Sequence, residues 1–315
     1  MKLYLAISFA ILLLIFIGAL WLGGPAPLKA LPNMNEPFMK VDFSSMPPLK
    51  TYQARDGVSL SYREYLPSSR QHIGSAVLVH GSSASSNSMH PMARALAAAG
   101  IHVYSLDIRG HGDSGKKGHI DYIGQLDSDM QAFVEAVQPV QPCALIGFSS
   151  GGGFVLRIAA SEMQNSFDKF ILLSPFLGPN APNYKPNSGG WVSVGVPRIV
   201  ALLALNAVGV KIWNHLTVTQ FALSDQAKKF LTPEYDFNLA MNFSVHQNYQ
   251  EDIRQAKGKV SLIAGELDEA FDTQALSGIV QKAEKNWPVY LLPSLGHIDL
   301  ILKEEAFDKI IELIH

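Results

Sequence analysis

A serine flanked by glycines is the feature that most constrains the fold of this 315-residue chain. The pentapeptide Gly147-Phe148-Ser149-Ser150-Gly151 stands between the apolar run 143–146 and the segment 152–160, which can continue as a helix. Small residues two positions either side of a serine permit a sharp strand-to-helix turn, because that turn brings backbone segments too close for a Cβ. Shifting the frame by one would place Phe148 where the first glycine belongs. The pattern therefore predicts Ser149, and not Ser150, as a nucleophile on a strained turn.

Composition excludes several other classes of protein. The net charge is −2, and no cluster of lysine and arginine supplies the concentrated basic surface that nucleic-acid phosphates require. The single cysteine, Cys143, excludes an internal disulfide and a cysteine-rich metal site. We therefore expect no nucleic-acid partner, no metal and no organic cofactor. The oligomeric state stays open.

The amino terminus has a different character from the rest of the chain. Residues 3–22 carry no charge and no proline, and a run of about 20 such residues can span a bilayer. Residues 1–24 are therefore predicted to be a signal anchor, with a cleaved signal peptide as the alternative. The expected protein is membrane-anchored with an extracytoplasmic catalytic domain, or secreted or periplasmic after cleavage. The proline-rich residues 25–49 are interpreted as a linker.

From residue 50 onward, short apolar runs alternate with helical stretches, which is typical of a mostly parallel sheet flanked by helices. Strands are predicted at residues 58–65, 76–80, 101–107, 143–146, 170–173, 260–264 and 289–292, and helices at 91–99, 125–140 and 303–314. About 85 residues separate the strand ending near 175 from the one beginning near 260, too many for a simple connection. The sequence therefore predicts one α/β domain over 50–315 with an inserted segment.

A serine hydroxyl needs a base within hydrogen-bond reach, and that base needs a carboxylate to fix its tautomer. In a sheet of this kind the acid and then the histidine follow the serine along the chain. Of the ten histidines, only His297 and His315 follow every candidate acid, and His315 is the terminal residue. His297 lies just after the last predicted strand, at the edge where open α/β sheets place their sites. We therefore expect His297 to be the base.

The residues alone leave the acid open. Four carboxylates crowd the loop after 260–264, namely Glu266, Asp268, Glu269 and Asp272. Asp299 lies too close to His297 in sequence to be the first choice, although it could orient the loop.

The order of these motifs resembles that of the α/β-hydrolases, and in particular serine hydrolases of the monoacylglycerol lipase and lysophospholipase type, which are similar to the serine aminopeptidase S33 group. The matching segments, in order, are His80-Gly81-Ser82-Ser83, residues 107–115, Gly118-His119-Ile120-Asp121, the Ser149 pentapeptide, Gly265-Glu266-Leu267-Asp268 and Gly296-His297. The resemblance covers residues 50–315. It implies an α/β-hydrolase fold with a helical cap, at about residues 177–250, inserted before the last two strands.

The resemblance also implies roles for single residues. Its Gly-x-x-Asp pattern selects Asp268 as the acid. Backbone N–H groups of Ser150, at the start of the helix, and of Ser82, in the turn after His80, are the expected donors to the oxyanion. We expect His80 to order its turn, and Arg109 and His111 to brace the loops without a catalytic role.

The implied activity is hydrolysis of a lipid-like carboxylic ester, such as a lysophospholipid or a monoacylglycerol, through an acyl-enzyme on Ser149. An acyltransferase or thioesterase with the same triad, and a non-catalytic membrane-anchored binding protein, are the alternatives. Phe148 and Ser150 stand where monoacylglycerol lipases usually have histidine and often have methionine. The uncharged segment 199–210 has two interpretations: a helix that packs on the sheet domain, or a lid that lines an acyl pocket and touches the bilayer.

Overall fold

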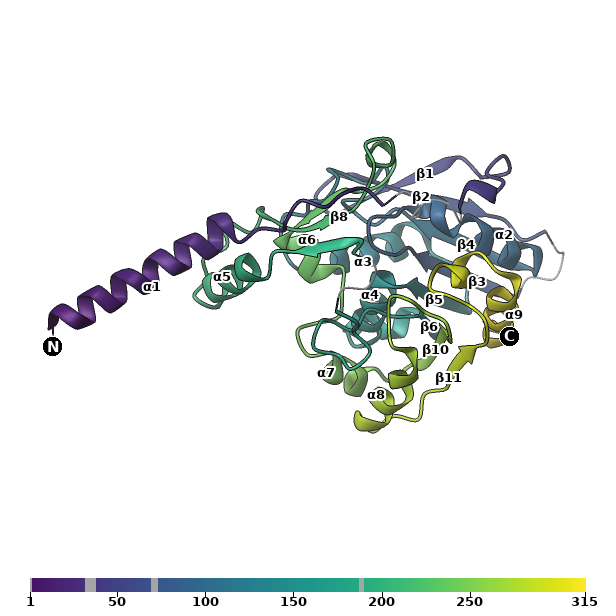
Figure 1. Cartoon of the computed structure of the whole chain (residues 1–315). Coiled ribbons are helices and arrows are strands. Elements are labelled where there is room, and N and C mark those ends of the chain that lie inside the picture. The colour runs from purple at the N-terminus through teal and green to yellow at the C-terminus, as the bar shows by residue number, and fades with distance from the viewer. Residues whose placement is uncertain (1, 32–37, 69–72, 187–189) are drawn as a thin grey trace.

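The computed structural model describes residues 2–31, 38–68, 73–186 and 190–315 (Figure 1). Its centre is an eight-stranded sheet with the order β1-β2-β4-β3-β5-β6-β10-β11. The strands are β1 (Leu49–Gln53), β2 (Ser59–Tyr65), β3 (Gly74–Val79), β4 (Ile101–Leu106), β5 (Cys143–Phe148), β6 (Lys169–Leu173), β10 (Lys259–Gly265) and β11 (Val289–Leu292). β2 pairs antiparallel with both of its neighbours, β1 and β4, and the other neighbouring strands pair parallel. The predicted α/β-hydrolase fold is confirmed.

The central strands are continuous apolar runs because both faces of the sheet are covered. Every residue of β3 and of β5 is buried. Side chains of β3 alternate between two cores, with Val77 and Val79 in one and Ala76 and Leu78 in the other.

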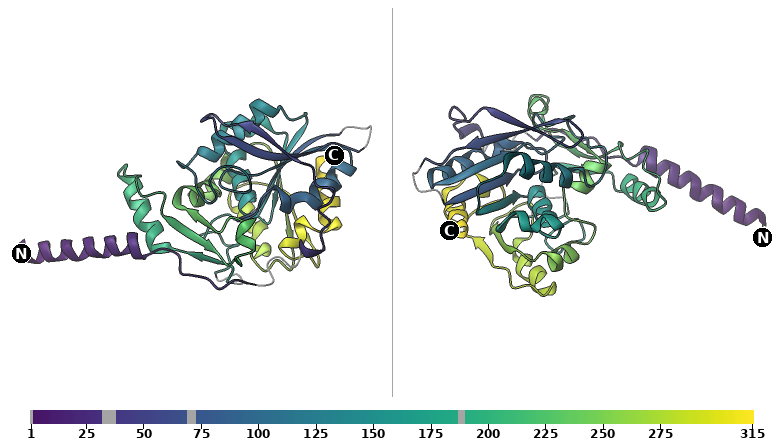
Figure 2. Two further views of the ribbon diagram at one scale, coloured as in Figure 1. Left: turned by 90° about the horizontal axis from the view of Figure 1, so that it is seen from above. Right: turned by 180° about the vertical axis from the view of Figure 1, so that it is seen from behind.

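Helices cover both faces of the sheet (Figure 2). The core that contains Val77 also takes side chains from α3 (Gln125–Val137), α4 (Ser150–Ala159) and α8 (Leu276–Lys282). The core that contains Leu78 takes side chains from α2 (His90–Ala98) and α9 (Glu304–Ile314). The helices pack on both faces of the sheet, so the loops at the carboxyl ends of its strands are anchored to a rigid scaffold.

The residues inserted between β6 and β10, which include the cap expected at about 177–250, contain both helices and a small sheet. The helices are α5 (Val196–Ala207), α6 (Phe237–Asn242) and α7 (Tyr249–Gln255). The antiparallel sheet has the order β7-β8-β9, with β7 (Val192–Val194), β8 (Thr217–Phe221) and β9 (Glu234–Asp236). The resemblance implied a helical cap here. The small sheet was not expected, because its outer strands are very short.

The prediction of a membrane anchor is wrong. The amino-terminal segment does form a helix, α1 (Lys2–Leu22). Across the described ranges, however, no helix meets the length and apolarity that a membrane crossing needs. The predicted location beyond a membrane depended on that anchor and falls with it. Residues 32–37 of the predicted linker lie outside the described residues.

The end of α1 is part of the packed structure, contrary to its interpretation as a segment apart from the fold. Leu20 is only 3% exposed and packs with Ala201 and Leu202 of α5. The Arg198 guanidinium donates to the carbonyl oxygens of Leu20 (2.8 Å) and Trp21 (2.9 Å), which are among the helix-end carbonyls that lack partners within α1. α1 therefore ends on the cap.

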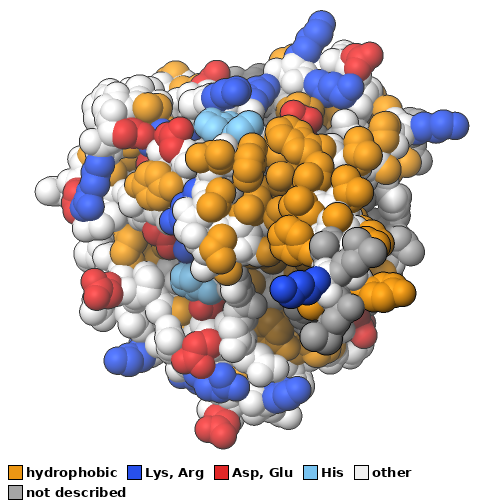
Figure 3. Space-filling model, turned by 90° about the vertical axis from the view of Figure 1, so that its left-hand side faces the viewer, with side chains coloured by type: hydrophobic (Ala, Val, Ile, Leu, Met, Phe, Trp, Pro, Cys, Tyr) orange, Lys and Arg blue, Asp and Glu red, His pale blue; other side chains and the backbone are white. Residues whose placement is uncertain are grey.

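This contact also bears on the two interpretations of the segment 199–210. α5 packs its buried face against α1 and the small sheet of the cap, which differs from the packing on the sheet domain that the first interpretation expected. Its other face remains exposed at Val196 and Val200. Figure 3 shows that apolar side chains gather on the side of the molecule that lies to the left in Figure 1.

Candidate active site

Ser149 occupies the strained turn that its neighbours predict. It lies between β5 and α4 with φ 57° and ψ −117°, a positive φ that costs energy for a residue with a Cβ. A Cβ on Gly151 would lie 2.6 Å from the carbonyl oxygen of Val79 and still closer to that of His80. Glycine is therefore required where α4 passes the end of β3, and the crowding holds Ser149 at the carboxyl edge of the sheet.

Asp268 and His297 meet at the same edge from the ends of two neighbouring strands. Asp268 follows β10, His297 follows β11, and both side chains are buried. The His297 Nδ1 lies 2.8 Å from Asp268 Oδ2. A carboxylate can only accept, so Nδ1 carries the proton and, in the neutral ring, Nε2 is free to act as a base.

Further donors surround the Asp268 carboxylate. Ser174, directly after β6, donates its hydroxyl to Oδ2 (2.6 Å), and the N–H groups of Ala270 (2.8 Å) and Phe271 (2.9 Å) donate to Oδ1. Burial alone would raise the pKa of Asp268, but the hydrogen bonds from His297, Ser174 and Phe271 together lower it below its ordinary value. The carboxyl group is therefore ionised at neutral pH, as a group that supports an imidazolium must be.

Ser149 and His297 line one cavity of about 490 Å³, a volume typical of a small-molecule site. Most of the other lining side chains are apolar. They come from the residues before the sheet, from the elbow, from the cap and from the His297 loop, and include Phe38, Met39, Phe43, Phe148, Trp191, Leu223, Ala227, Phe230, Leu231, Ile298 and Ile301. No residue of 199–210 is among those that line this cavity, so the interpretation of that segment as a lid over an acyl pocket finds no support here.

The two expected oxyanion donors lie on adjoining turns. Ser82 lines the cavity, and its hydroxyl is hydrogen-bonded to that of Ser150. Ser150 opens α4, so its N–H belongs to the first turn, where amides have no partner within the helix. The contact ties the turn after β3 to the start of α4.

Buried polar side chains order the turn after β3. The ring of His80 donates from Nδ1 to the carbonyl of Gly81 (2.8 Å) and accepts at Nε2 from the N–H of Ile108 (3.2 Å). Tyr235 of β9 accepts from the N–H of Ser83 (2.6 Å) and donates to Nε2 of His111 (2.6 Å). Burial lowers the pKa of both histidines, so both act as neutral hydrogen-bonding groups, in keeping with the structural roles expected for them.

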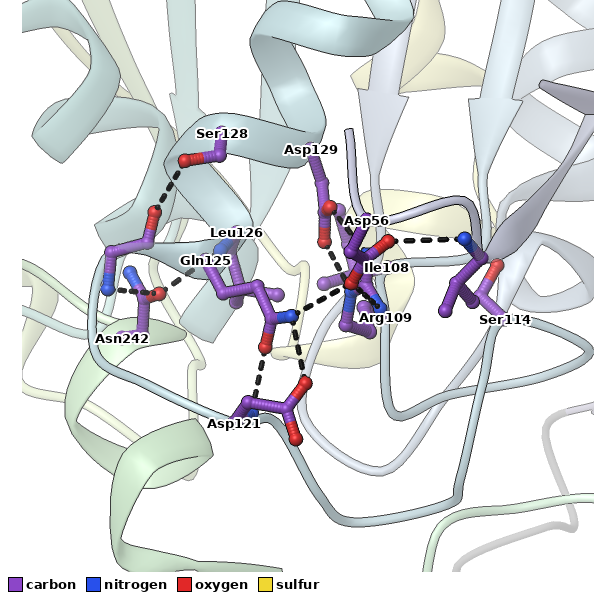
Figure 4. A network of polar contacts seen from close by, with 12 residues as sticks. Asp56, Ile108, Arg109, Ser114, Asp121, Gln125, Leu126, Ser128, Asp129 and Asn242 are labelled. Carbon is purple, nitrogen blue, oxygen red and sulfur yellow. Dashed lines mark hydrogen bonds and ion pairs between the residues drawn. The ribbon is translucent and has the colours of Figure 1, made fainter. Parts of the chain in front are cut away.

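Arg109 holds the next loop in place (Figure 4). Its guanidinium makes two hydrogen bonds to the Asp129 carboxylate, at 2.7 and 2.8 Å, and a third to Asp56 at 3.2 Å. Arg109 and Asp129 are both buried, and a paired charge of this kind leaves no unmatched ion in the interior. The motif at 107–115 therefore braces the fold around the site.

Three features of the site were not predicted from the sequence: the hydrogen bond from Ser174 to Asp268, the role of Glu269, and the apolar side chains at residues 38–43. Ser174 belongs to no motif, and only its position at the carboxyl end of a buried strand could have indicated its role. Glu269 accepts from the backbone N–H of His297 (2.9 Å), and it was weighed only as a candidate acid. The apolar side chains at residues 38–43 lie in a segment that was interpreted as a linker.

Asp299 is not one of these missed features, since it was expected to orient the His297 loop. Its carboxylate accepts from the N–H of Gly296 (2.9 Å).

Metal ligands are not grouped at the site: in the described ranges, no three His, Cys, Asp or Glu side chains are arranged to hold a metal ion.

Comparison with known proteins agrees with this geometry. The model of the family described as serine aminopeptidase, S33 matches residues 70–285. A monoacylglycerol lipase from Mycolicibacterium smegmatis is 34% identical over 162 residues, which are 50% of this chain and 54% of that protein. The match thus spans about half the length of that curated relative.

Solved structures agree on the fold. A soluble variant of monoglyceride lipase from Saccharomyces cerevisiae superposes with a TM-score of 0.66 at 16% identity, covering 92% of this chain and 98% of that one. A membrane phospholipase A superposes with a TM-score of 0.55 at 16% identity and covers 99% of both chains. The family match extends over more than half of the sequence, and the chain belongs to the serine aminopeptidase S33 family of α/β-hydrolases as a serine hydrolase.

Proposed function

We propose that this enzyme hydrolyses lipid-like carboxylic esters of the monoacylglycerol or lysophospholipid type, with Ser149 as nucleophile, His297 as base and Asp268 as its partner. The observation that carries the proposal is the apolar cavity that Ser149 and His297 share. We assign the catalytic domain to residues 50–315 and the cap to about 177–250.

Acylation begins when the Ser149 hydroxyl attacks the ester carbonyl and its proton passes to His297 Nε2. The oxyanion that forms takes hydrogen bonds from the backbone N–H groups of Ser82 and Ser150. Asp268 stabilises the imidazolium through Nδ1. As the intermediate collapses, the carbon–oxygen bond to the alcohol breaks, and the alcohol leaves with the proton from His297.

Deacylation repeats these steps with water as the nucleophile. His297 removes a proton from water, the resulting hydroxide attacks the acyl carbonyl, and the proton returns to the Ser149 oxygen as the fatty acid leaves. The net reaction converts one ester and one water into one alcohol and one acid.

Two features support a lipid-like acyl group. The cavity lining is mostly apolar and includes aromatic rings from three separate segments, which suits a hydrocarbon chain better than a peptide. The curated relative is a monoacylglycerol lipase, as is one of the structural neighbours described above.

The test measures release of fatty acid from monooleoylglycerol and lysophosphatidylcholine by the full-length chain, with an aminoacyl p-nitroanilide as the peptide-like competitor. We expect ester cleavage that falls about a thousandfold or more in Ser149→Ala, because that variant lacks the nucleophile. Ser161→Ala, which changes a serine that caps a 3₁₀ turn elsewhere, is the matched control. Cleavage of the anilide alone, or full esterase activity in Ser149→Ala, would overturn the proposal.

A further inference from the structure

The described residues Phe38–Met46, which we call the strap, precede the first strand of the sheet and lie outside the part of the chain that the family model matches. The strap begins with a 3₁₀ turn at residues 38–40. The N–H of Val41 donates to the carbonyl of Phe38, and that of Met46 to the carbonyl of Phe43, each at 3.1 Å. The strap therefore has a defined backbone, although its sequence has no helical or strand period.

A buried histidine fastens the strap to the sheet domain. His90, at the start of α2, donates from Nε2 to the carbonyl of Asp42 (3.2 Å) and accepts at Nδ1 from the hydroxyl of Tyr65 (3.0 Å). The ring of Phe43 packs on His90 with a centroid distance of 5.9 Å. The Arg63 guanidinium also donates to the carbonyl of Pro47, just beyond the strap. These contacts fix the strap at both its middle and its end.

The strap presents apolar side chains to the catalytic cavity. Phe38, Met39 and Phe43 line the same cavity as Ser149 and His297. Met39 is nevertheless 81% exposed and Phe43 37% exposed. Side chains that line a cavity and also contact solvent stand at its mouth, so the strap forms part of the entrance.

The cap supplies a matching group at this entrance. Phe230 and Leu231 line the cavity too, and Phe230 is 67% exposed. Large apolar side chains from two separate segments, exposed around one cavity, are typical of a site for an apolar ligand. A hydrocarbon chain with its carbonyl at Ser149 is the occupant that this lining suits, because it would cover these groups without requiring a polar partner from them.

We propose that the strap is the outer wall of the acyl-binding site and gives this hydrolase a preference for esters with one long acyl chain. The inference rests on the proposed ester hydrolysis at Ser149. A short acyl chain occupies only the inner part of the cavity, near the triad. A long chain extends to the entrance and packs on Phe38 and Met39, so only long-chain esters gain binding from the strap.

The experiment compares kcat/KM for p-nitrophenyl laurate with that for p-nitrophenyl butyrate in the full-length chain. In Phe38→Ala/Met39→Ala we expect the laurate-to-butyrate ratio to fall about tenfold, since lost apolar contacts in a pocket change specificity by this order. Met39→Leu keeps an apolar side chain of similar size and should keep the ratio. Leu66→Ala, which truncates an apolar side chain that is 68% exposed outside the cavity, is the matched control.

A ratio rather than a single rate is measured because a general loss of folding lowers both rates together. Should the double variant unfold, Met39→Ala alone replaces it, since so exposed a side chain contributes little to folding, and the ratio should fall in the same direction. An unchanged ratio in a folded variant would overturn the strap inference while leaving the proposed function intact. A wild-type protein that cleaves neither ester would overturn the proposed function, and the strap inference with it.

Discussion

The hydroxyl of Ser174 is one of the donors that hold Asp268 in position, and its loss should slow catalysis without unfolding the chain. In Ser174→Ala the Asp268 carboxylate loses one of the two hydrogen bonds at Oδ2 but keeps the one from His297 and those from the two backbone N–H groups. Hydrogen bonds to charged groups contribute about 1.5–3 kcal/mol, so we expect kcat/KM to fall by roughly tenfold to a hundredfold.

The measurement is kcat/KM on a soluble ester as a function of pH, with thermal unfolding as the folding check. Because Ser174 helps to lower the pKa of Asp268, its removal should also raise that pKa and move the acidic limit of activity toward neutral pH. A kcat/KM within twofold of wild type at every pH would contradict this prediction, because it would show that the other donors hold Asp268 in position without Ser174.

The site residues differ in how far the sequence alone could predict their roles. Ser149 and His297 could be proposed because the elbow glycines and the chain order limit the choices. Asp268 needed the resemblance, since four carboxylates share its loop and spacing does not separate them. Ser174 and Glu269 act through contacts between segments distant in sequence, and no local pattern marks such contacts.

At the scale of an element, the start of α4 is the most constrained backbone in the site. A Cβ at Gly151 would collide with the end of β3, whereas one at Gly278, inside α8, would meet nothing within 4 Å. We expect Gly151→Ala to prevent the elbow from forming and to abolish activity. Gly278→Ala should instead raise stability by up to about 1 kcal/mol, because alanine is the better helix former.

The pair is compared by urea unfolding and by esterase activity on the same preparations. Equal unfolding free energies and equal esterase activities in the two variants would contradict the close approach of α4 to β3. A Gly151→Ala enzyme of normal activity would contradict the assignment of this turn as the nucleophile elbow.

The elements that the sequence predicted well are those whose pattern is local. The runs that became β3, β5, β6 and β10 are continuously apolar because they are buried on both faces. The cap sheet was missed since β7 and β9 have three residues each, too few to show a period of two. The strap was missed for a related reason: it is held by His90 and by aromatic packing rather than by a repeating pattern.

At the scale of the whole molecule, three buried neutral histidines make stability depend on pH. Burial lowers the pKa of His80, His90 and His111 below the ordinary value of 6.5. The unfolded chain then binds more protons than the folded chain below that pH. The contribution of these rings to the free energy of unfolding is therefore fully present above pH 6.5. It falls as the pH drops, by up to about 1.4 kcal/mol per pH unit for each proton that the chain takes up on unfolding.

Urea unfolding midpoints between about pH 7.5 and 5.5 measure this dependence. We expect the midpoint to fall with pH in the wild type and to fall less steeply in His90→Gln. Glutamine retains a donor for the Asp42 carbonyl but takes up no proton. A midpoint that is constant across this range would contradict the buried neutral state of these rings.

The amino-terminal segment shows how composition alone can mislead at this scale. Its uniform apolarity predicted a separate anchor, but sequence composition carries no information about what the end of a helix contacts. In the structure, Arg198 and α5 join the end of α1 to the cap, and residues 38–43 of the predicted linker lie at the cavity. Residues 25–49, which were predicted to be a linker, thus contribute side chains to the catalytic cavity.

The most direct measurement is covalent labelling of the full-length protein with a fluorophosphonate, followed by digestion and mass spectrometry of the peptide that contains Ser149. We predict an adduct on Ser149 that is absent in Ser149→Ala and forms at least about a hundredfold more slowly in His297→Ala, which lacks the base. Ser150 lies in the same peptide and serves as the internal control. An adduct on Ser150, or none in a folded protein, would contradict the assignment of Ser149 as the catalytic nucleophile.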